Sequence, residues 1–460
     1  MSEPLSTLRV AIVGAGPSGF FAAEALQKAA PGIRIDLLDR LPTPFGLVRG
    51  GVAPDHPKIK SVTRVYDRIA TQPGFRFLGH VEVGSDVTIE ALRAAYDAVI
   101  LANGARTDRP LGIPGEQLAG SHAATEFVGW YNGHPDYAEA TFDLGQRAVA
   151  VVGLGNVAMD VTRVLAKSPD VLATTDLAAH ALAALRDSQV RTVHVIGRRG
   201  PVQAACTTPE LRELGELEGV DVLVDPRDLD LDPISAAHLA SSEDRTAEKN
   251  LQVLREWAER GSTGATRRIV FHFNASPVEL LGDDRVTGLR VVRNRLEDDG
   301  QGGVRAVPTD VVETLEVGLV FRSVGYRGVP IDGVPFDARR GTIPNAAGRV
   351  LDADGEPIAG LYTAGWIKRG PSGVIGTNKS CAAETVASLI ADVAAGQVGR
   401  GAGDPDALLA ELDARGVRRT DWADWQRLDA EEQARGAAAG RPREKITEIS
   451  AMLRFLQKEI

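Results

Sequence analysis

Short apolar runs that end at a glycine recur along the chain and predict buried strands of a parallel sheet. Residues 8–13 form such a run, rich in β-branched side chains, and it stops at Gly14. Helix-forming residues follow over 18–30 and end at a Pro-Gly pair, which is a helix stop signal. Residues 33–38 alternate like a second strand that closes on Asp39. The pattern predicts one strand–helix–strand unit within about 30 residues.

The same pattern returns in the middle of the chain. Residues 148–152 are strand-like, 157–166 are helix-like and 191–196 are strand-like again. Two such units in one chain predict two nucleotide-binding folds.

The remaining pattern predicts further strands and a helical C-terminal end. Residues 268–295 are typical of antiparallel strands with a turn at 282–284, whereas the polar region 221–266 favours helices with loops. Over 445–456 apolar residues recur at helical spacing, which we interpret as core packing. Three further strand-like runs lead into glycine, at 96–104, 318–326 and 360–365.

Composition narrows the class of protein. The chain has 460 residues with 43% hydrophobic and 25% charged positions, so wholesale disorder is excluded. The net charge of −10 argues against binding to nucleic acid or to an anionic membrane. Only Cys206 and Cys381 occur, which excludes a CxxC redox pair, a cysteine-ligated cluster and a disulfide framework. Without a signal sequence or an apolar run of about 18 residues, we expect a cytoplasmic protein.

The first glycine motif has the spacing of a dinucleotide-binding turn. Gly14, Gly16 and Gly19 form GxGxxG with Ala15 between the first two, directly after a strand and at the start of a helix. The first glycine permits the tight turn, the second lets backbone approach a pyrophosphate, and the third lets helix and strand pack closely. Asp39 ends the second strand, where a carboxylate accepts bonds from ribose hydroxyls.

The second motif differs at the end of its second strand. Residues 153–158 read GxGxxA, but the strand that follows the helix ends in Gly197-Arg198-Arg199 and not in an acid. Guanidinium groups bind a 2′-phosphate that a carboxylate would repel, so this unit is predicted to prefer NADPH to NADH. An ordinary solvated turn is the alternative.

Two dinucleotide sites without a cysteine pair suggest that one holds a flavin permanently and the other takes a nicotinamide transiently. The acid-terminated first unit suits FAD, and the arginine-terminated second unit suits NADP. Gly373 and Gly376 bracket an apolar pair where a helix start would direct N–H groups at a flavin. A plain glycine turn remains possible there, as does a core role for Trp366.

Three polar residues have ordinary explanations as well as functional ones. His56 stands in a polar loop, and Asp160 lies one turn inside the second predicted helix. Glu210 resembles the first turn of a helix with Thr208 as N-cap and Pro209 at the first position.

Several runs resemble the adrenodoxin-reductase-type ferredoxin–NADP reductases, including their bacterial members, and the likeness covers essentially the whole chain. The runs are Pro44-Phe45-Gly46-Leu47-Val48-Arg49 with residues 51–60, Gly155-Asn156-Val157-Ala158-Met159-Asp160, Gly197-Arg198-Arg199-Gly200, and residues 365–378 (GWIKRGPSGVIGTN).

The resemblance implies an α/β protein with two Rossmann-like, ββα-supplemented domains, in which an NADP domain (108–329) is inserted into a discontinuous FAD domain. The FAD domain would comprise 1–107 and, with a C-terminal helical segment, 330–460. The FAD contacts would be Gly14, Ala15, Gly16, Gly19, Asp39, Leu47, Val83, Trp366, Gly373, Val374 and Ile375. The NADP contacts would be Arg109, Gly153, Leu154, Gly155, Asn156, Val157, Arg198, Arg199, Glu210 and Gly373. His56 and Asp160 match family positions discussed for proton handling.

These patterns together lead us to expect an FAD-dependent NADPH:ferredoxin oxidoreductase without a metal site, working as a monomer. Its partner would be a small, acidic iron–sulfur ferredoxin. An NADPH-dependent flavin diaphorase or quinone reductase and a non-catalytic flavin redox sensor are the alternatives. A basic docking face would be drawn from Arg245, Lys249, Arg255, Arg260, Arg267 and Arg268.

Overall fold

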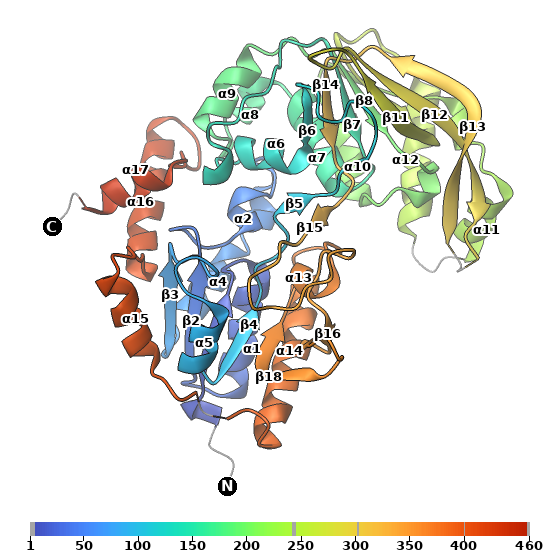
Figure 1. The fold of residues 1–460 in the computed structure, drawn as a ribbon. Coiled ribbons are helices and arrows are strands. Elements are labelled where there is room, and N and C mark those ends of the chain that lie inside the picture. The colour runs from blue at the N-terminus through green and yellow to red at the C-terminus, as the bar shows by residue number, and fades with distance from the viewer. Residues whose placement is uncertain (1–4, 242–244, 301–302, 400, 458–460) are drawn as a thin grey trace. The chain divides into compact units, whose positions relative to one another are not determined.

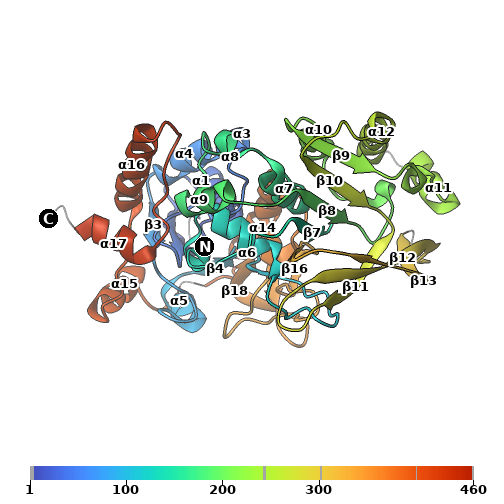
Figure 2. The same ribbon diagram turned by 90° about the horizontal axis from the view of Figure 1, so that it is seen from above.

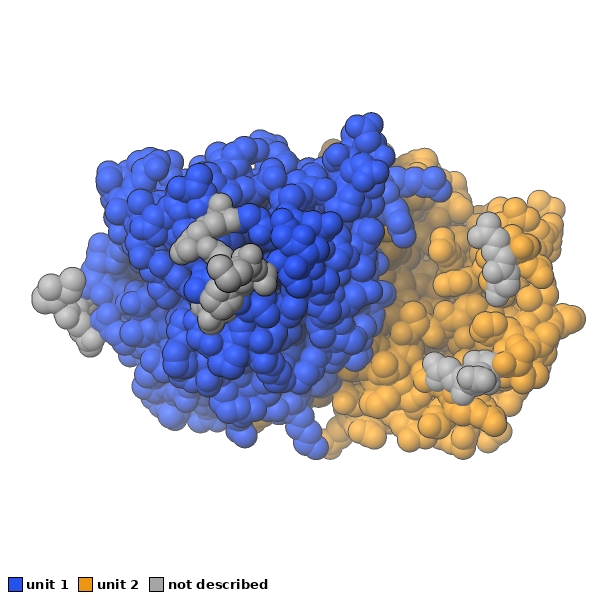
Figure 3. Space-filling view, turned by 90° about the horizontal axis from the view of Figure 1, so that it is seen from below, with its two compact units in different colours: residues 1–107, 132–135, 325–460 blue, residues 108–131, 136–324 orange. Residues whose placement is uncertain are grey.

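The computed structural model describes residues 5–241, 245–300, 303–399 and 401–457. The chain divides into two compact units, coloured separately in Figure 3. Unit 1 comprises Met1–Thr107, Asn132–Pro135 and Gly325–Ile460, and unit 2 comprises Asp108–Tyr131 and Asp136–Val324.

Unit 1 is built on a seven-stranded sheet (Figure 1). Its order is β16 (Asn345–Ala346), β17 (Arg349–Leu351), β18 (Pro357–Thr363), β4 (Ala98–Leu101), β1 (Arg9–Val13), β2 (Arg34–Asp39) and β3 (Phe75–Gly79). The five strands from β18 to β3 are parallel, and β16 and β17 extend the sheet antiparallel. A strand from the end of the chain therefore lies directly beside strands from its beginning.

Helices cover both faces of this sheet because its strands alternate apolar side chains to either side. Val10 and Ile12 belong to the cluster that contains α1 and α14, whereas Ala11 and Val13 belong to the cluster of α5 and α15. Figure 1 shows α15, α16 and α17 along the β3 side. The helices of unit 1 are α1 (Pro17–Ala29), α2 (Leu47–Gly50), α3 (Pro57–Lys60), α4 (Thr63–Ala70), α5 (Ile89–Ala95), α13 (Trp366–Arg369), α14 (Thr377–Ala394), α15 (Pro405–Ala414), α16 (Trp422–Ala438) and α17 (Ile449–Gln457).

Unit 2 contains a six-stranded parallel sheet and a three-stranded antiparallel one (Figure 2). The parallel order is β6 (Ser121–Ala123), β14 (Leu319–Arg322), β7 (Ala148–Val152), β8 (Thr192–Ile196), β10 (Arg267–His272) and β9 (Val220–Val224). The antiparallel strands are β11 (Ala275–Leu281), β12 (Gly288–Asp298) and β13 (Val304–Leu315). The two short strands β5 (Thr107–Asp108) and β15 (Tyr326–Arg327) complete the strands of the described residues.

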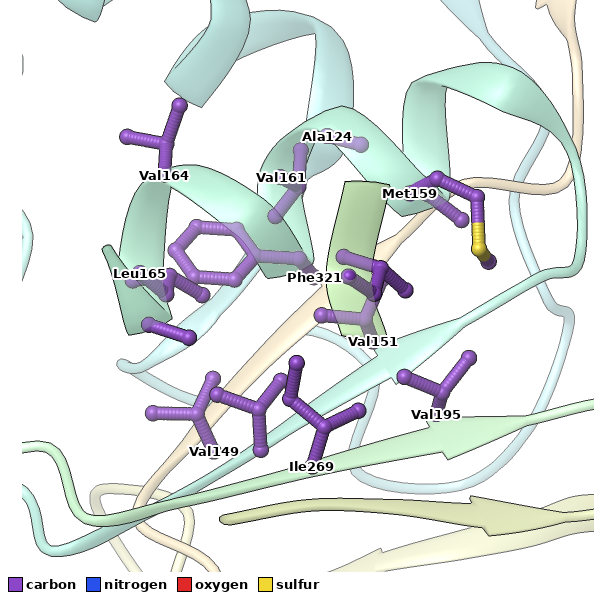
Figure 4. Packing of buried hydrophobic residues seen from close by; sticks show 14 of the residues in the cluster. Ala124, Val149, Val151, Met159, Val161, Val164, Leu165, Val195, Ile269 and Phe321 are labelled. Carbon is purple, nitrogen blue, oxygen red and sulfur yellow. The ribbon is translucent and has the colours of Figure 1, made fainter. Parts of the chain in front are cut away.

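The core of unit 2 lies between its parallel sheet and helix α7 (Asn156–Ala166). Figure 4 shows Val161 and Leu165 of α7 above Val151, Val195 and Ile269, which come from three neighbouring strands. The other helices of unit 2 are α6 (Ala124–Tyr131), α8 (Pro169–Leu172), α9 (Ala179–Arg186), α10 (Thr208–Gly215), α11 (Pro233–Ser241) and α12 (Thr246–Arg260). The expected fold class of two Rossmann-like folds is confirmed.

Three expectations from the sequence were wrong in detail. Residues 268–272 belong to β10, which is parallel to β8 and β9 and not antiparallel. Strand β9 lies in the region expected to be helical, and its Asp221 binds the backbone N–H of Thr263 at 3.0 Å. Helix α17 begins at Ile449, after the expected start at 445, because the N–H of Ile446 donates to Glu432 instead. No helix among the described residues has the length and apolar character that crossing a membrane requires.

A pair of histidines on neighbouring strands makes the stability of unit 2 depend on pH. His194 Nδ1 lies 2.9 Å from His272 Nε2, and both rings are half-buried. Burial, His272 and Arg268 lower the pKa of His194 from 6.5 to about 4, and burial also lowers the pKa of His272.

We expect acid to destabilise unit 2. A lowered folded-state pKa means that the unfolded chain binds the proton first, so stability is lost as pH falls from 6.5 towards 4. For His194 alone the loss between pH 7 and pH 5 is roughly 2 kcal/mol. This loss of stability is measured by hydrogen exchange of the β8 amides, corrected for the pH dependence of the intrinsic exchange rates. His194→Gln should flatten the pH dependence, whereas exposed His238→Gln should leave it unchanged. If the stability of unit 2 changed equally with pH in the wild type, His194→Gln and His238→Gln, the prediction would be contradicted.

Candidate functional site

The first glycine turn lies where the strand order of unit 1 reverses, between β1 and β4. Gly14 has φ +109°, and a Cβ there would lie 2.5 Å from the Ala102 carbonyl oxygen. A Cβ on Gly19 would lie 2.0 Å from the Gly14 carbonyl oxygen. Only glycine permits both approaches, and they bring the start of α1 to the edge where open parallel sheets bind ligands.

Asp39 faces this turn from the end of β2. Its Oδ2 accepts from the Ala15 N–H at 2.8 Å and its Oδ1 from the Leu41 N–H at 3.0 Å. Burial raises the pKa of Asp39 although both N–H groups act to lower it. The N-cap of α1, Gly16, makes no side-chain cap, so the N-terminal N–H groups of the helix face outward for an anion.

Two further loops reach the same edge. Phe45 donates its N–H to the Ala15 carbonyl at 2.8 Å, two residues before Leu47 begins α2. Val81 donates to the Asp39 carbonyl at 2.9 Å, two residues before half-buried Val83. Both regions thus lie beside residues of the first glycine turn.

The C-terminal part of unit 1 adds Trp366 and the start of α14. A Cβ on Gly365 would lie 2.0 Å from Ser18 Oγ, which places the start of α13 against the start of α1. Ser18 Oγ also donates to Asn378 Oδ1 at 3.0 Å. Helix α14 begins after Gly376 without a side-chain cap, and Gly373, Val374 and Ile375 lead into it, with Gly373 and Val374 exposed and Ile375 half-buried.

Unit 1 also has buried polar atoms that a ligand would satisfy. The indole N–H of Trp366 and the amide oxygen of Asn103 are buried and have no hydrogen-bond partner within the described part of the chain. Such groups are rare in native structures unless something else binds them. Together with the first glycine turn, Asp39 and the helix starts without side-chain caps, Trp366 and Asn103 fit a dinucleotide with a flavin ring.

The glycine turn of unit 2 repeats this construction at the reversal between β7 and β14. Gly153 has φ +139°, and a Cβ there would lie 2.2 Å from the Ser323 carbonyl oxygen. The Leu154 side chain packs against Gly197, which follows β8. A Cβ on Gly197 would lie 2.1 Å from the Leu154 Cδ1 atom. Helix α7 starts after Gly155, again without a side-chain cap, with Asn156 and Val157 in its first turn.

Arg198 and Arg199 follow β8 beside this turn. Arg198 is exposed and Arg199 half-buried, and neither guanidinium has a carboxylate partner among the residues that the structure describes. Burial lowers the pKa of Arg199, and the positive charge of the neighbouring Arg198 lowers it further. The pair is suited to an anionic ligand group.

Asp160 and Glu210 meet at a buried arginine that the sequence analysis missed. Arg163 is fully buried, and its guanidinium lies 2.6 Å from Asp160 Oδ1, 3.3 Å from Glu210 Oε2 and 3.4 Å from Glu213 Oε2. The i,i+3 spacing of Asp160 and Arg163 was the available signal. A structural role for Glu210 is therefore established alongside any role in binding.

The expected helix start before Glu210 was wrong by one residue. Helix α10 begins at Thr208, so its N-cap is Thr207 and not Thr208, and Thr207 makes no side-chain cap. The Thr207 N–H donates instead to Asn156 Oδ1 at 2.8 Å, which ties α10 to the start of α7.

The other expected residues lie as follows. His56 is only 9% exposed and immediately precedes α3 in unit 1. Arg109 is exposed in unit 2, after β5. The structure carries no ligand, and the roles expected for these residues stay predictions.

Of the six residues expected for a basic docking face, Arg267 is half-buried and the other five are exposed, and their role in docking stays a prediction. The guanidinium of Arg267 donates to the Ala166 carbonyl at 3.0 Å, and that of Arg268 to Thr192 Oγ1 at 3.0 Å. Exposed Arg245 pairs with Glu248 at 2.6 Å. Lys249, Arg255 and Arg260 are exposed on α12 or at its end.

Comparison with known proteins decides the family. Residues 8–224 match the model of the pyridine nucleotide-disulphide oxidoreductases. The chain is 48% identical to NADPH-ferredoxin reductase FprA of Mycobacterium tuberculosis over 97% of this chain and 98% of that protein. The chain belongs to the family of NADPH-ferredoxin and adrenodoxin reductases.

Other members of the NADPH-ferredoxin and adrenodoxin reductase family are similarly close. The mitochondrial NADPH:adrenodoxin oxidoreductase of Bos taurus is 44% identical over 98% of this chain and 92% of its own. The solved structure of Mycobacterium tuberculosis FprA in complex with NADPH superposes with a TM-score of 0.91 at 47% identity, covering 98% of this chain and 99% of that one.

We expect Arg163→Met to destabilise unit 2 strongly. The substitution leaves the carboxylates of Asp160 and Glu210 without their buried cation, which costs about 3–5 kcal/mol. Arg227→Met is the matched control, because Arg227 pairs with Asp225 on the surface, where such a pair contributes about 0–1 kcal/mol. Urea unfolding read by hydrogen exchange in α7 measures both. A loss under 1 kcal/mol for Arg163→Met would refute the structural role.

Proposed function

We propose that this protein is an FAD-dependent NADPH:ferredoxin oxidoreductase. It would take a hydride from NADPH and pass single electrons to a small iron–sulfur ferredoxin. The observation that carries this assignment is the contrast between its two glycine turns. One is followed by the Asp39 carboxylate, and the other by an arginine pair that has no acid partner in the part of the chain that the structure describes.

Unit 1 supplies the residues for FAD. The N-terminus of α1 would hold the pyrophosphate between Ala15 and Gly19, and Asp39 would accept from the ribose hydroxyls. FAD, once bound, supplies the conversion between hydride transfer and single-electron transfer. Trp366 would donate its buried N–H to the cofactor, and the uncapped start of α14 favours negative charge beside residues 373–375. Leu47 and Val83 would contact FAD with their apolar side chains.

Unit 2 supplies the residues for NADPH. The glycine turn at residues 153–157, with the N–H groups at the start of α7, would bind the pyrophosphate. Arg198 and Arg199 would bind the 2′-phosphate through charge-assisted hydrogen bonds. Arg109, Glu210 and Gly373 remain proposed further contacts.

His56 and Asp160 are proposed for proton handling and coupling. The Asp160 side chain is 14% exposed and bound to Arg163 at 2.6 Å, so its carboxylate is held in a fixed orientation and stays partly accessible. No side chain is needed as a nucleophile in hydride or electron transfer.

A cytoplasmic location and a monomeric state also belong to the proposal. Both cysteines are buried and free, which suits a reducing compartment. The molar mass of the purified holoprotein, measured by light scattering, tests whether it is a monomer.

Reduction by NADPH is the direct test of the activity. We expect the purified protein to be yellow with bound FAD, and NADPH to bleach its absorbance faster than NADH in anaerobic stopped flow. A ferredoxin should then restore the absorbance and support cytochrome c reduction. Turnover with quinones but not with any ferredoxin of the host would favour a diaphorase. A flavin that NADPH does not bleach would favour a sensor.

Removing the arginine pair should abolish the preference for NADPH. Each charge-assisted hydrogen bond contributes about 1.5–3 kcal/mol, so Arg198→Ala with Arg199→Ala should raise the KM for NADPH by roughly 100-fold or more. The KM for NADH should change less than about threefold, because NADH has no 2′-phosphate for the pair to bind. Steady-state kinetics with both coenzymes measures the ratio. Equal increases for the two coenzymes would defeat the assignment of the pair.

A further inference from the structure

The turn at Phe45–Gly46 has a strained backbone beside the first glycine turn. Phe45 has φ +85°, which a bulky residue rarely adopts, and Gly46 has φ +47°. A Cβ on Gly46 would lie 3.0 Å from the Gly16 Cα, so the two backbones are in close contact. A strained conformation of this kind persists only where the surrounding structure enforces it.

Aromatic side chains of α16 hold one side of this turn. The Phe45 ring packs edge-on against Trp425 with centroids 5.3 Å apart, and against Trp422 at 6.1 Å. Both tryptophans come from the first turn of α16, which lies before the apolar run at 445–456 that we interpreted as core packing.

A buried ion pair holds the other side. Arg49 lies in α2, which starts directly after this turn, and its guanidinium binds Glu432 of α16 through two bonds of 2.8 and 2.5 Å. The Glu432 side chain is fully buried, and it also accepts from Arg443 at 3.2 Å and from the Ile446 N–H at 2.9 Å. Burial alone would raise the pKa of Glu432, but Arg49 and Arg443 bring the net pKa below its usual value.

The C-terminal segment also holds the backbone of Arg49. Lys445 Nζ donates to the Arg49 carbonyl at 3.2 Å and to the Asn132 carbonyl at 3.0 Å. The Arg49 guanidinium lies 5.3 Å from the centre of the Trp425 ring. The side chain and the main chain of Arg49 in α2 are thus both bound by residues 425–445.

We propose that Glu432 is a positioning residue for FAD. Through Arg49, Glu432 keeps the Phe45–Gly46 turn in the conformation that contacts Gly16. This contact shapes the part of the first glycine turn that would bind the pyrophosphate. This inference rests on the proposed function, because it takes FAD as the ligand of unit 1. It assigns the segment after Trp422 to the binding of the cofactor.

A buried ion pair is not needed for stability alone, which makes the inference testable. An apolar pair of similar volume is often as stable as a buried salt bridge. If Glu432 only supported folding, Arg49→Met with Glu432→Met would restore both the melting temperature and the binding of FAD. If it positions the turn, the double variant recovers the melting temperature while FAD binding stays weak.

The first measurement compares FAD binding in Glu432→Gln with a matched control. Asp392→Asn provides the control, since Asp392 is also buried in unit 1 and binds Arg349 through bonds of 2.9 and 2.7 Å. We expect the FAD dissociation constant of Glu432→Gln to rise about tenfold or more, and that of Asp392→Asn to change less than about twofold. Deflavination and titration with FAD, followed by flavin fluorescence, measures both.

The second measurement is kinetic. With excess FAD, Glu432→Gln should regain the wild-type kcat and keep the wild-type KM for NADPH, because its defect lies in retaining the cofactor. A kcat that excess FAD does not restore would overturn the inference. So would equal FAD dissociation constants in Glu432→Gln and Asp392→Asn, or normal FAD binding in the double methionine variant. A wild-type chain that binds no FAD would overturn the proposed function as well.

Discussion

A glycine that faces a carbonyl oxygen of the neighbouring strand is the contact on which both units depend. Gly14 faces Ala102 across the reversal between β1 and β4, and Gly153 faces Ser323 across the reversal between β7 and β14. Any side chain would push the strand ends apart there. Because the gap is closed by backbone alone, α1 and α7 each start at the sheet edge, and neither start has a side-chain cap, which suits both to bind an anion.

The elements that could be predicted from the sequence are those whose determinants are close together in the chain. Each glycine turn, its strand and its helix lie within about 20 residues, and Asp39 and Arg198 end the next strand. Pairings over long separations could not be predicted in this way. Arg163 and Glu210 are 47 positions apart, and Arg49 and Glu432 are 383 apart. Strand β10 was misjudged for the same reason, since its parallel partners come from distant segments.

Acidic neighbours decide what the arginines of this protein do. Buried Arg163 is bound by three carboxylates, and Arg49 by the buried carboxylate of Glu432, which neutralise these arginines and make them part of the framework. Arg198 and Arg199 have no such carboxylate partner among the described residues, so their charge remains available to a ligand. The sequence shows the arginines but not this distinction, because the acids that neutralise Arg49 and most of those around Arg163 are remote in sequence.

The pairing of β4 with β18 has a consequence for how the protein is made. Thr363 bonds to Leu101 across 262 positions, so the edge of β4 stays open while all of unit 2 leaves the ribosome. At about 5–20 residues per second this exposure lasts tens of seconds. Unit 2 is complete before that edge is covered and is free to fold first. Until β18 is synthesised, the sheet of unit 1 is incomplete and the apolar strand β4 is an unpaired edge strand. This nascent intermediate is the one most in need of a chaperone.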